Sequence, residues 1–129
     1  MNRAFIVDAY AWVEYLDGSS RGEKVRDIVE DEKNRVFTCA ITIAEVISKF
    51  IRREHEPRVA YDAMTSISII VRIDEELSKL AGEKHAESRK RVRDFGLADA
   101  YVLACSHKLQ AMILTGDMHF TGIPKTVFV

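Results

Sequence analysis

The feature that most constrains the fold is the alternation of short apolar runs with longer amphipathic segments. The apolar runs cover residues 4–7, 36–40, 68–73, 111–115 and 126–129, the last of them expected at a sheet edge. Continuous apolar character is typical of strands that are covered on both faces of a parallel sheet. Since strands separated by helices form βαβ units, the pattern predicts an α/β fold.

The segments between these runs carry apolar residues at helical spacing. Such stripes fall within residues 43–51, 59–67, 77–81 and 97–109, and residues 19–32 form a further predicted helix. The sequence contains no repeat, low-complexity tract or linker. We therefore predict that residues 1–129 form a single-domain, three-layer α/β/α sandwich. Its twisted sheet should be mostly parallel and have about five strands.

Length and composition fit a soluble domain. Hydrophobic residues make up 47% of the 129 residues, which is enough for a core without disulfides. The 19 basic and 20 acidic residues leave a net charge of −1. That balance argues against a protein that coats DNA or a membrane by bulk charge, although nucleic acid can still be a substrate. No apolar stretch approaches the roughly 20 residues that a membrane helix needs.

The cysteines and the N-terminus predict the cellular compartment of the chain. Cys39 and Cys105 lie in apolar surroundings, which predicts buried free thiols in a reducing compartment. The N-terminus enters an apolar run directly and lacks the anatomy of a signal peptide. We therefore expect a cytoplasmic protein without a membrane partner.

Acidic residues follow the predicted strands, at the edge where ligands bind in parallel sheets. Asp8 follows the first strand and Asp117 follows the fourth. Glu45 and Asp99 lie in the first turns of two predicted helices. If the sheet is wound as proposed, all four carboxylates reach the same edge.

Each of these acids also has a purely structural explanation. Asp8 is a favourable helix N-cap, and Thr42 with Glu45 matches a capping box. Asp99 complements a helix dipole, and Asp117 fits a turn. Because capping by itself places acids at this edge, the topology alone leaves catalysis undecided.

The sequence lacks the motifs of several other kinds of active site. The chain has no glycine-rich phosphate loop, no GxSxG elbow and no HExxH or CxxC zinc pattern. His119, two residues after Asp117, could contact substrate but is not expected to. A group of acids without a nucleophile suits Mg²⁺, which prefers oxygen ligands and can activate water for attack on a phosphodiester.

Several stretches carry a resemblance to a known family. They are Ile6–Trp12, Thr42–Val46, Gly96–Ala100 and Leu114–Asp117 with Phe120. Their order and spacing resemble the PIN-domain ribonucleases of the VapC toxin type, nearly end to end. The resemblance implies an endoribonuclease that hydrolyses RNA phosphodiester bonds with Mg²⁺ or Mn²⁺.

The resemblance also assigns roles to residues. It implies that Asp8 and Asp99 are the principal metal ligands, and that Glu45 and Asp117 complete the site directly or through water. Thr115 falls where the family often has a hydroxyl that supports the pocket. The resemblance further implies a homodimer and a cognate antitoxin whose C-terminal segment lies across the active site.

Basic and aromatic residues are candidates for RNA contacts. The densest basic run, Arg89, Lys90, Arg91 and Arg93, is predicted to steer RNA toward the acids, with a solvated helix end as the alternative. Arg52 and Arg53 are a second, weaker candidate. Tyr10 and Trp12 are expected to pack in the core or in a dimer interface rather than on a base.

Two other functions stay open from the residues alone. A phosphoacceptor domain of the receiver type would use Asp74, Thr115 and Lys125, but it leaves Glu45 and Asp99 unexplained. A non-catalytic RNA-binding or scaffold protein on the same fold is the other alternative.

Overall fold

The structure is a computed structural model that describes residues 2–129. In these residues, five strands form one sheet in the order β3-β2-β1-β4-β5, and every neighbouring pair is parallel. The strands are β1 (Ala4–Val7), β2 (Arg35–Cys39), β3 (Ile69–Val71), β4 (Met112–Thr115) and β5 (Thr126–Phe128). The predicted parallel sheet is confirmed, with β5 at an edge.

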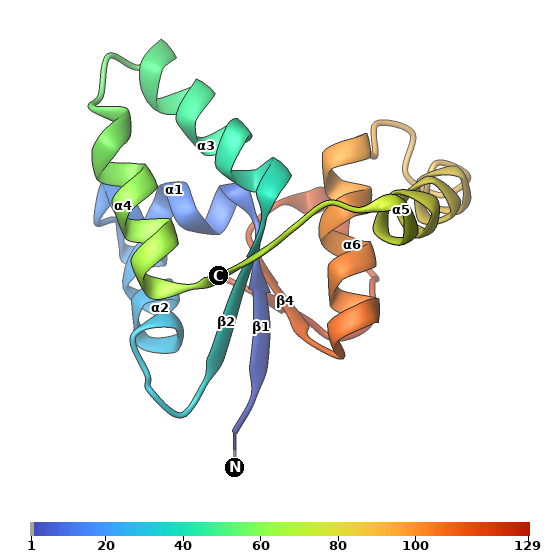
Figure 1. Ribbon diagram of the computed structural model, residues 1–129, viewed down its shortest axis with the longest axis horizontal. Coiled ribbons are helices and arrows are strands. Elements are labelled where there is room, and N and C mark those ends of the chain that lie inside the picture. The colour runs from blue at the N-terminus through green and yellow to red at the C-terminus, as the bar shows by residue number, and fades with distance from the viewer. Residues whose placement is uncertain (1) are drawn as a thin grey trace.

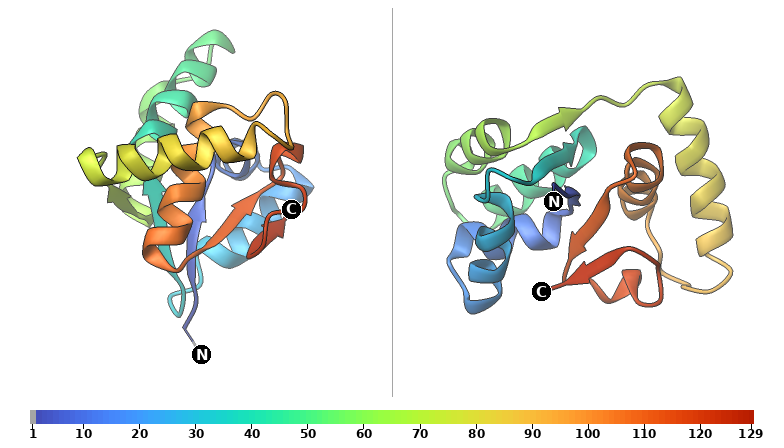
Figure 2. Two further views of the ribbon diagram at one scale, coloured as in Figure 1. Left: turned by 90° about the vertical axis from the view of Figure 1, so that its right-hand side faces the viewer. Right: turned by 90° about the horizontal axis from the view of Figure 1, so that it is seen from below.

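Helices cover both faces of the sheet. They are α1 (Ala9–Asp17), α2 (Ser20–Val29), α3 (Ala40–Arg52), α4 (Pro57–Ile67), α5 (Glu75–Ser88) and α6 (Leu97–Leu109), with a short 3₁₀ helix η1 (Met118–Phe120). Helices α1 to α4 lie on one side and α5 and α6 on the other (Figures 1 and 2). This arrangement confirms the predicted three-layer sandwich.

The central strand β1 explains why its run is continuously apolar. Successive side chains of a strand point to opposite faces. Phe5 and Val7 pack in the cluster under α1 to α4, whereas Ile6 packs in the cluster under α5 and α6. All three side chains are fully buried. Since β1 leads directly into α1, the residue between them is held at the carboxyl edge of the sheet.

Trp12 belongs to the core, as predicted. Its ring is fully buried, and its Nε1 donates to Thr38 Oγ1 at 3.0 Å. Thr38 Oγ1 in turn lies 2.6 Å from Ser68 Oγ. This chain of hydrogen bonds satisfies the polar atoms that the packing of α1 and α4 on the sheet removes from water.

The structure confirms the expected state of the cysteines and gives a different end for one predicted helix. Cys39 and Cys105 are buried free thiols, as expected. The predicted helix over 19–32 ends at Val29, because Asp31 forms a turn in which it accepts from the backbone N–H groups of Lys33 and Asn34. None of the helices in residues 2–129 has both the length and the apolar character needed to cross a membrane.

Candidate active site

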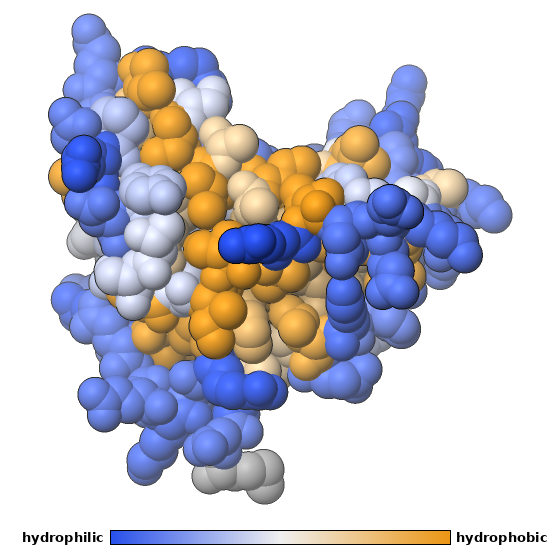
Figure 3. All heavy atoms as spheres, viewed as in Figure 1, coloured by the Kyte–Doolittle hydropathy of each residue, from blue (hydrophilic) through white to orange (hydrophobic). Residues whose placement is uncertain are grey.

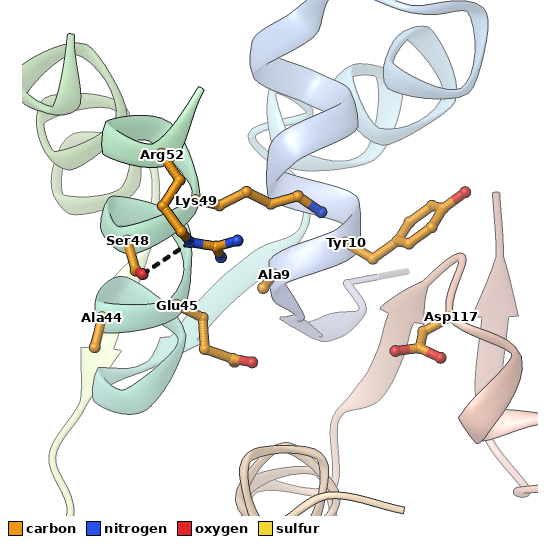
Figure 4. Close-up of a pocket in the computed structure, with 8 residues that line it drawn as sticks. All are labelled: Ala9, Tyr10, Ala44, Glu45, Ser48, Lys49, Arg52 and Asp117. Carbon is orange, nitrogen blue, oxygen red and sulfur yellow. Dashed lines mark hydrogen bonds between the residues drawn. The ribbon is translucent and has the colours of Figure 1, made fainter. Parts of the chain in front are cut away.

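Four acidic side chains from separate segments meet at the carboxyl edge of the sheet. Asp8 lies between β1 and α1, Glu45 on α3, Asp99 on α6, and Asp117 between β4 and η1. The charges of Asp99 and Asp117 act on both Asp8 and Glu45. Figure 4 shows Glu45 and Asp117 facing one another across a cavity of about 580 Å³. The structure therefore gathers the acids that follow separate strands.

Asp8 is both a helix cap and a buried carboxylate. Its Oδ1 accepts from the backbone N–H of Ala11 at 2.9 Å, and its Oδ2 accepts from the hydroxyl of Thr115. Burial raises the pKa of Asp8 to about 7, against the hydrogen bonds from Thr115 and Ala11, which lower it. The neighbouring charges of Asp117 and Asp99 raise the pKa further. Capping of α1 therefore explains the contact of Asp8 with Ala11, but not its contact with Thr115 or the acids near it.

Glu45 does not cap its helix. Because β2 leads directly into α3, the N-cap is Cys39, and Glu45 lies in the second turn. The capping-box interpretation of Thr42 with Glu45 is therefore wrong. Among the described residues, no hydrogen bond or ion pair holds the Glu45 carboxylate. Burial raises the pKa of Glu45 to about 7 and is the largest cause of the shift. The charges of Asp99 and Asp117 are the next largest causes.

A histidine that was not expected at the site, His119, lies between Asp99 and Asp117. The Nδ1 of His119 lies 3.0 Å from Asp99 Oδ2 and 3.7 Å from Asp117 Oδ1. The hydrogen bond with Asp99 raises the pKa of His119 above its usual value. One ligand atom from each of the three residues lies within 4.8 Å of the others. The only sequence signal for His119 was its position two residues after Asp117.

Backbone contacts orient the same two acids. Asp99 Oδ2 accepts from the N–H of Gly96 at 2.9 Å, as expected for an acid in the first turn of α6. Asp117 Oδ1 accepts from the N–H of His119 at 2.9 Å. Each carboxylate oxygen has two lone pairs, so these contacts leave acceptor capacity for a cation.

Thr115 connects two of the carboxylate segments. Its side chain is fully buried at the end of β4. Its hydroxyl donates to Asp8 Oδ2 and accepts from the backbone N–H of Asp117 at 2.9 Å. The structure thus places Thr115 where it orients Asp8 and the turn that carries Asp117.

Replacing Thr115 with Val is expected to impair this arrangement. The change leaves the Asp117 N–H without an acceptor and Asp8 without a donor, which should cost about 1–3 kcal/mol of unfolding free energy. If these carboxylates hold a divalent cation, loss of the group that orients them should also lower metal affinity by about 10- to 100-fold. Thr115→Ser keeps the hydroxyl and is the matched control. Equal metal affinities for the two variants, measured by calorimetry, would contradict this role.

The cations beside the cavity differ from those favoured by the sequence. Lys49 and Arg52 line the cavity, since they lie four and seven residues after Glu45 on the same helix. Arg53 instead lies 3.6 Å from Asp17. The predicted basic run of Arg89, Lys90, Arg91 and Arg93 is exposed between α5 and α6, and it lines no cavity at the acidic site. Arg52 was the weaker candidate from the sequence, and its helical spacing from Glu45 is the signal that could have favoured it.

Tyr10 lines the cavity as well and is only half-buried, so it does not belong to the core. It lies in the first turn of α1, next to the open carboxyl edge, whereas Trp12 faces the core.

Asp74, the residue on which a receiver-type function would depend, caps α5 through a hydrogen bond from the N–H of Leu77 at 2.8 Å. Asp74 Oδ2 also lies 3.8 Å from Lys108 Nζ, and Asp74 lines no cavity at the acidic site.

Solved structures share this fold. A toxin–antitoxin complex from Klebsiella pneumoniae aligns with a TM-score of 0.70 and 21% identity, covering 95% of this chain and 94% of that chain. VapBC2 from Rickettsia felis, bound to a promoter DNA fragment, aligns with a TM-score of 0.71 and 17% identity, covering 98% and 97%. Mycobacterium tuberculosis VapC20, a toxin that cleaves the sarcin-ricin loop, aligns with a TM-score of 0.77 and 18% identity, covering 97% and 98%.

The sequence comparison gives the family. No curated protein sequence matches the chain. The family model described as PIN domain matches residues 5–125, a range that includes β2, β3, β4 and all of β1 except Ala4, and that ends just before β5. It also includes Asp8, Glu45, Asp99 and Asp117. The chain therefore belongs to the PIN domain family.

Proposed function

We propose that this chain is a Mg²⁺- or Mn²⁺-dependent endoribonuclease that hydrolyses RNA phosphodiester bonds. The observation that carries the proposal is the convergence of Asp8, Glu45, Asp99 and Asp117 on one edge of the sheet. Like charges held this close are unfavourable unless a proton or a cation neutralises them. Burial raises the pKa values of Asp8 and Glu45 to about 7, and the charges of Asp99 and Asp117 add to the shift in both.

The donor set fits a hard divalent cation. Carboxylate oxygens are the ligands that Mg²⁺ and Mn²⁺ prefer, and few of them suffice because the ion keeps several waters. Asp8 and Asp99 would hold the ion, and Glu45 and Asp117 would complete the site directly or through water. When bound, the cation neutralises these carboxylates and polarises a phosphodiester and the water that attacks it.

The residues around the cavity have separate tasks in this proposal. Lys49 and Arg52 attract the RNA backbone and offset the charge of the acids. Glu45 orients the attacking water and takes up its proton, since a carboxyl with a pKa near 7 is suited to proton transfer at neutral pH. Thr115 keeps Asp8 in place through its hydroxyl.

We further propose that the nuclease is the toxin of a toxin–antitoxin pair. Structures that share its fold include a toxin–antitoxin complex and VapBC complexes, and one is a toxin that cleaves the sarcin-ricin loop. A cognate antitoxin would then inhibit the chain in a cytoplasmic setting.

A homodimer is proposed from the same resemblance. The face in Figure 3 carries apolar side chains over α3 and over the segment that leads from β3 toward α5. Ile69 on β3 is 60% exposed and Ile73 on the segment that follows is 40% exposed, and a second copy would cover this surface.

The proposal is tested by cleavage of a mixed RNA pool with Mg²⁺, with excess EDTA, and with the Asp8→Asn protein. We expect cleavage that disappears in both the EDTA and the Asp8→Asn samples. Cleavage that survives either change would show that the carboxylate site is not responsible. Co-expression with a candidate antitoxin, followed by the same assay, tests the toxin assignment.

A further inference from the structure

A second cavity adjoins the acidic site on the other side of Tyr10. It has a volume of about 550 Å³ and shares Tyr10 and Asp117 with the first cavity. Its other lining residues come from α2, from η1 and the turn before it, and from the C-terminal end of the chain: they are Arg21, Gly116, Met118, His119, Phe128 and Val129. In Figure 4 the Tyr10 ring extends away from Glu45 and Lys49, which places its hydroxyl on the side of this second cavity.

Two glycines allow the walls of this cavity to form. A Cβ at Gly116 would lie 2.1 Å from Cε1 of Tyr10, so the ring packs directly against this backbone. A Cβ at Gly22 would lie 2.0 Å from the carbonyl oxygen of Glu14, so α2 can approach α1 closely only with glycine here. That approach brings Arg21, the residue before Gly22, to the Tyr10 hydroxyl, to which its guanidinium donates.

The sheet register supplies an exposed aromatic ring on the same side. Phe128 pairs with Thr115 in the parallel ladder of β4 and β5. It therefore lies at the same level of the sheet as the residue that contacts Asp8. Phe128 is 44% exposed and Met118, also in the cavity wall, is 74% exposed. The cavity thus combines a guanidinium with apolar surface, next to the carboxylates.

We propose that this second cavity binds an unpaired nucleotide of the substrate, adjacent to the bond that is cleaved. Arg21 contacts a phosphate, and Phe128 stacks against the base. Both contacts are typical of the recognition of single-stranded nucleic acid, in which aromatic rings hold unstacked bases and cations follow the backbone. The guanidinium of Arg21 disfavours a basic peptide as the occupant. The inference rests on the proposed function for the identity of its ligand.

Binding of a labelled, single-stranded 2′-O-methyl RNA tests the proposal without cleavage. We expect Phe128→Leu to weaken binding by about 5- to 150-fold, the range typical of the loss of one stacked base. We expect Arg21→Gln to weaken binding and to reduce the slope of log affinity against log salt by about 1. Phe128→Tyr keeps the ring and should bind like the original chain, as should Lys33→Gln, which removes an exposed charge outside both cavities.

An abasic oligonucleotide separates stacking from a general effect on the fold. The original chain should bind it more weakly than the normal oligonucleotide, whereas Phe128→Leu should bind the two almost equally. Full affinity of both Phe128→Leu and Arg21→Gln, or equal affinity of the original chain for single strands and duplexes, would overturn the subsite. If the subsite fails while Mg²⁺-dependent cleavage persists, the proposed function stands. If binding behaves as expected without cleavage, the proposed function fails instead.

Discussion

Replacing Glu45 with Gln is expected to lower RNA cleavage in Mg²⁺ by about 10²- to 10⁴-fold, the usual contribution of a positioned proton acceptor. The free energy of unfolding should not decrease, because Glu45 neither caps α3 nor forms an ion pair among the described residues. Removing one of several neighbouring negative charges should leave the midpoint of thermal unfolding unchanged or slightly higher. The loss of activity would therefore report on chemistry rather than on stability.

The matched control is Glu83→Gln, which removes an exposed carboxylate from α5, away from both cavities. Single-turnover cleavage and thermal unfolding should be measured for the original chain and for both variants. If Glu45→Gln cleaves as fast as Glu83→Gln, Glu45 has no part in the reaction.

Mg²⁺ is expected to stabilise the chain more at pH 8 than at pH 5. In the folded state the pKa of Asp8 is about 7, well above its usual value of 3.8, so folding favours its protonated form. The stability that this group contributes is full below about pH 4 and is lost as the pH rises through about 7. A divalent cation that binds the deprotonated carboxylates would therefore restore most stability at the higher pH.

The size of the effect follows from mass action. A cation at 100 times its dissociation constant adds about 2.7 kcal/mol, which for a chain of this length raises the unfolding midpoint by roughly 10 °C. Asp8→Asn should raise the midpoint of the metal-free chain at pH 8 and reduce the gain from Mg²⁺. Thermal scans at both pH values, with and without Mg²⁺, measure this directly. An equal gain at pH 5 and pH 8 would contradict it.

The sheet was predictable because its signal is strong and local. Each strand is an apolar run, and β1 in particular is buried on both faces, so its whole length had to be apolar. The placement of Asp8 and Asp117 followed directly, since each comes right after such a strand. Boundaries were less certain where a side chain competes for the backbone, as Asp31 does beyond the end of α2.

The surroundings of the acids were harder to predict because they depend on contacts between distant segments. Whether Glu45 caps its helix depends on where α3 begins, and that is set by the way β2 runs into it. His119 reaches Asp99 across 20 residues of sequence. A dense basic run looked favourable for RNA contact, yet Lys49 and Arg52 reach the cavity because they share a helix face with Glu45.

The most direct test of the central claim is the chemistry of the cleaved ends of one RNA, read by mass spectrometry after incubation with Mg²⁺ or with EDTA. Attack by water at a carboxylate–metal site predicts linear terminal phosphates with Mg²⁺ and intact RNA with EDTA. Ends with a 2′,3′-cyclic phosphate, or cleavage that persists in EDTA, would mean that the carboxylate cluster does not perform the reaction.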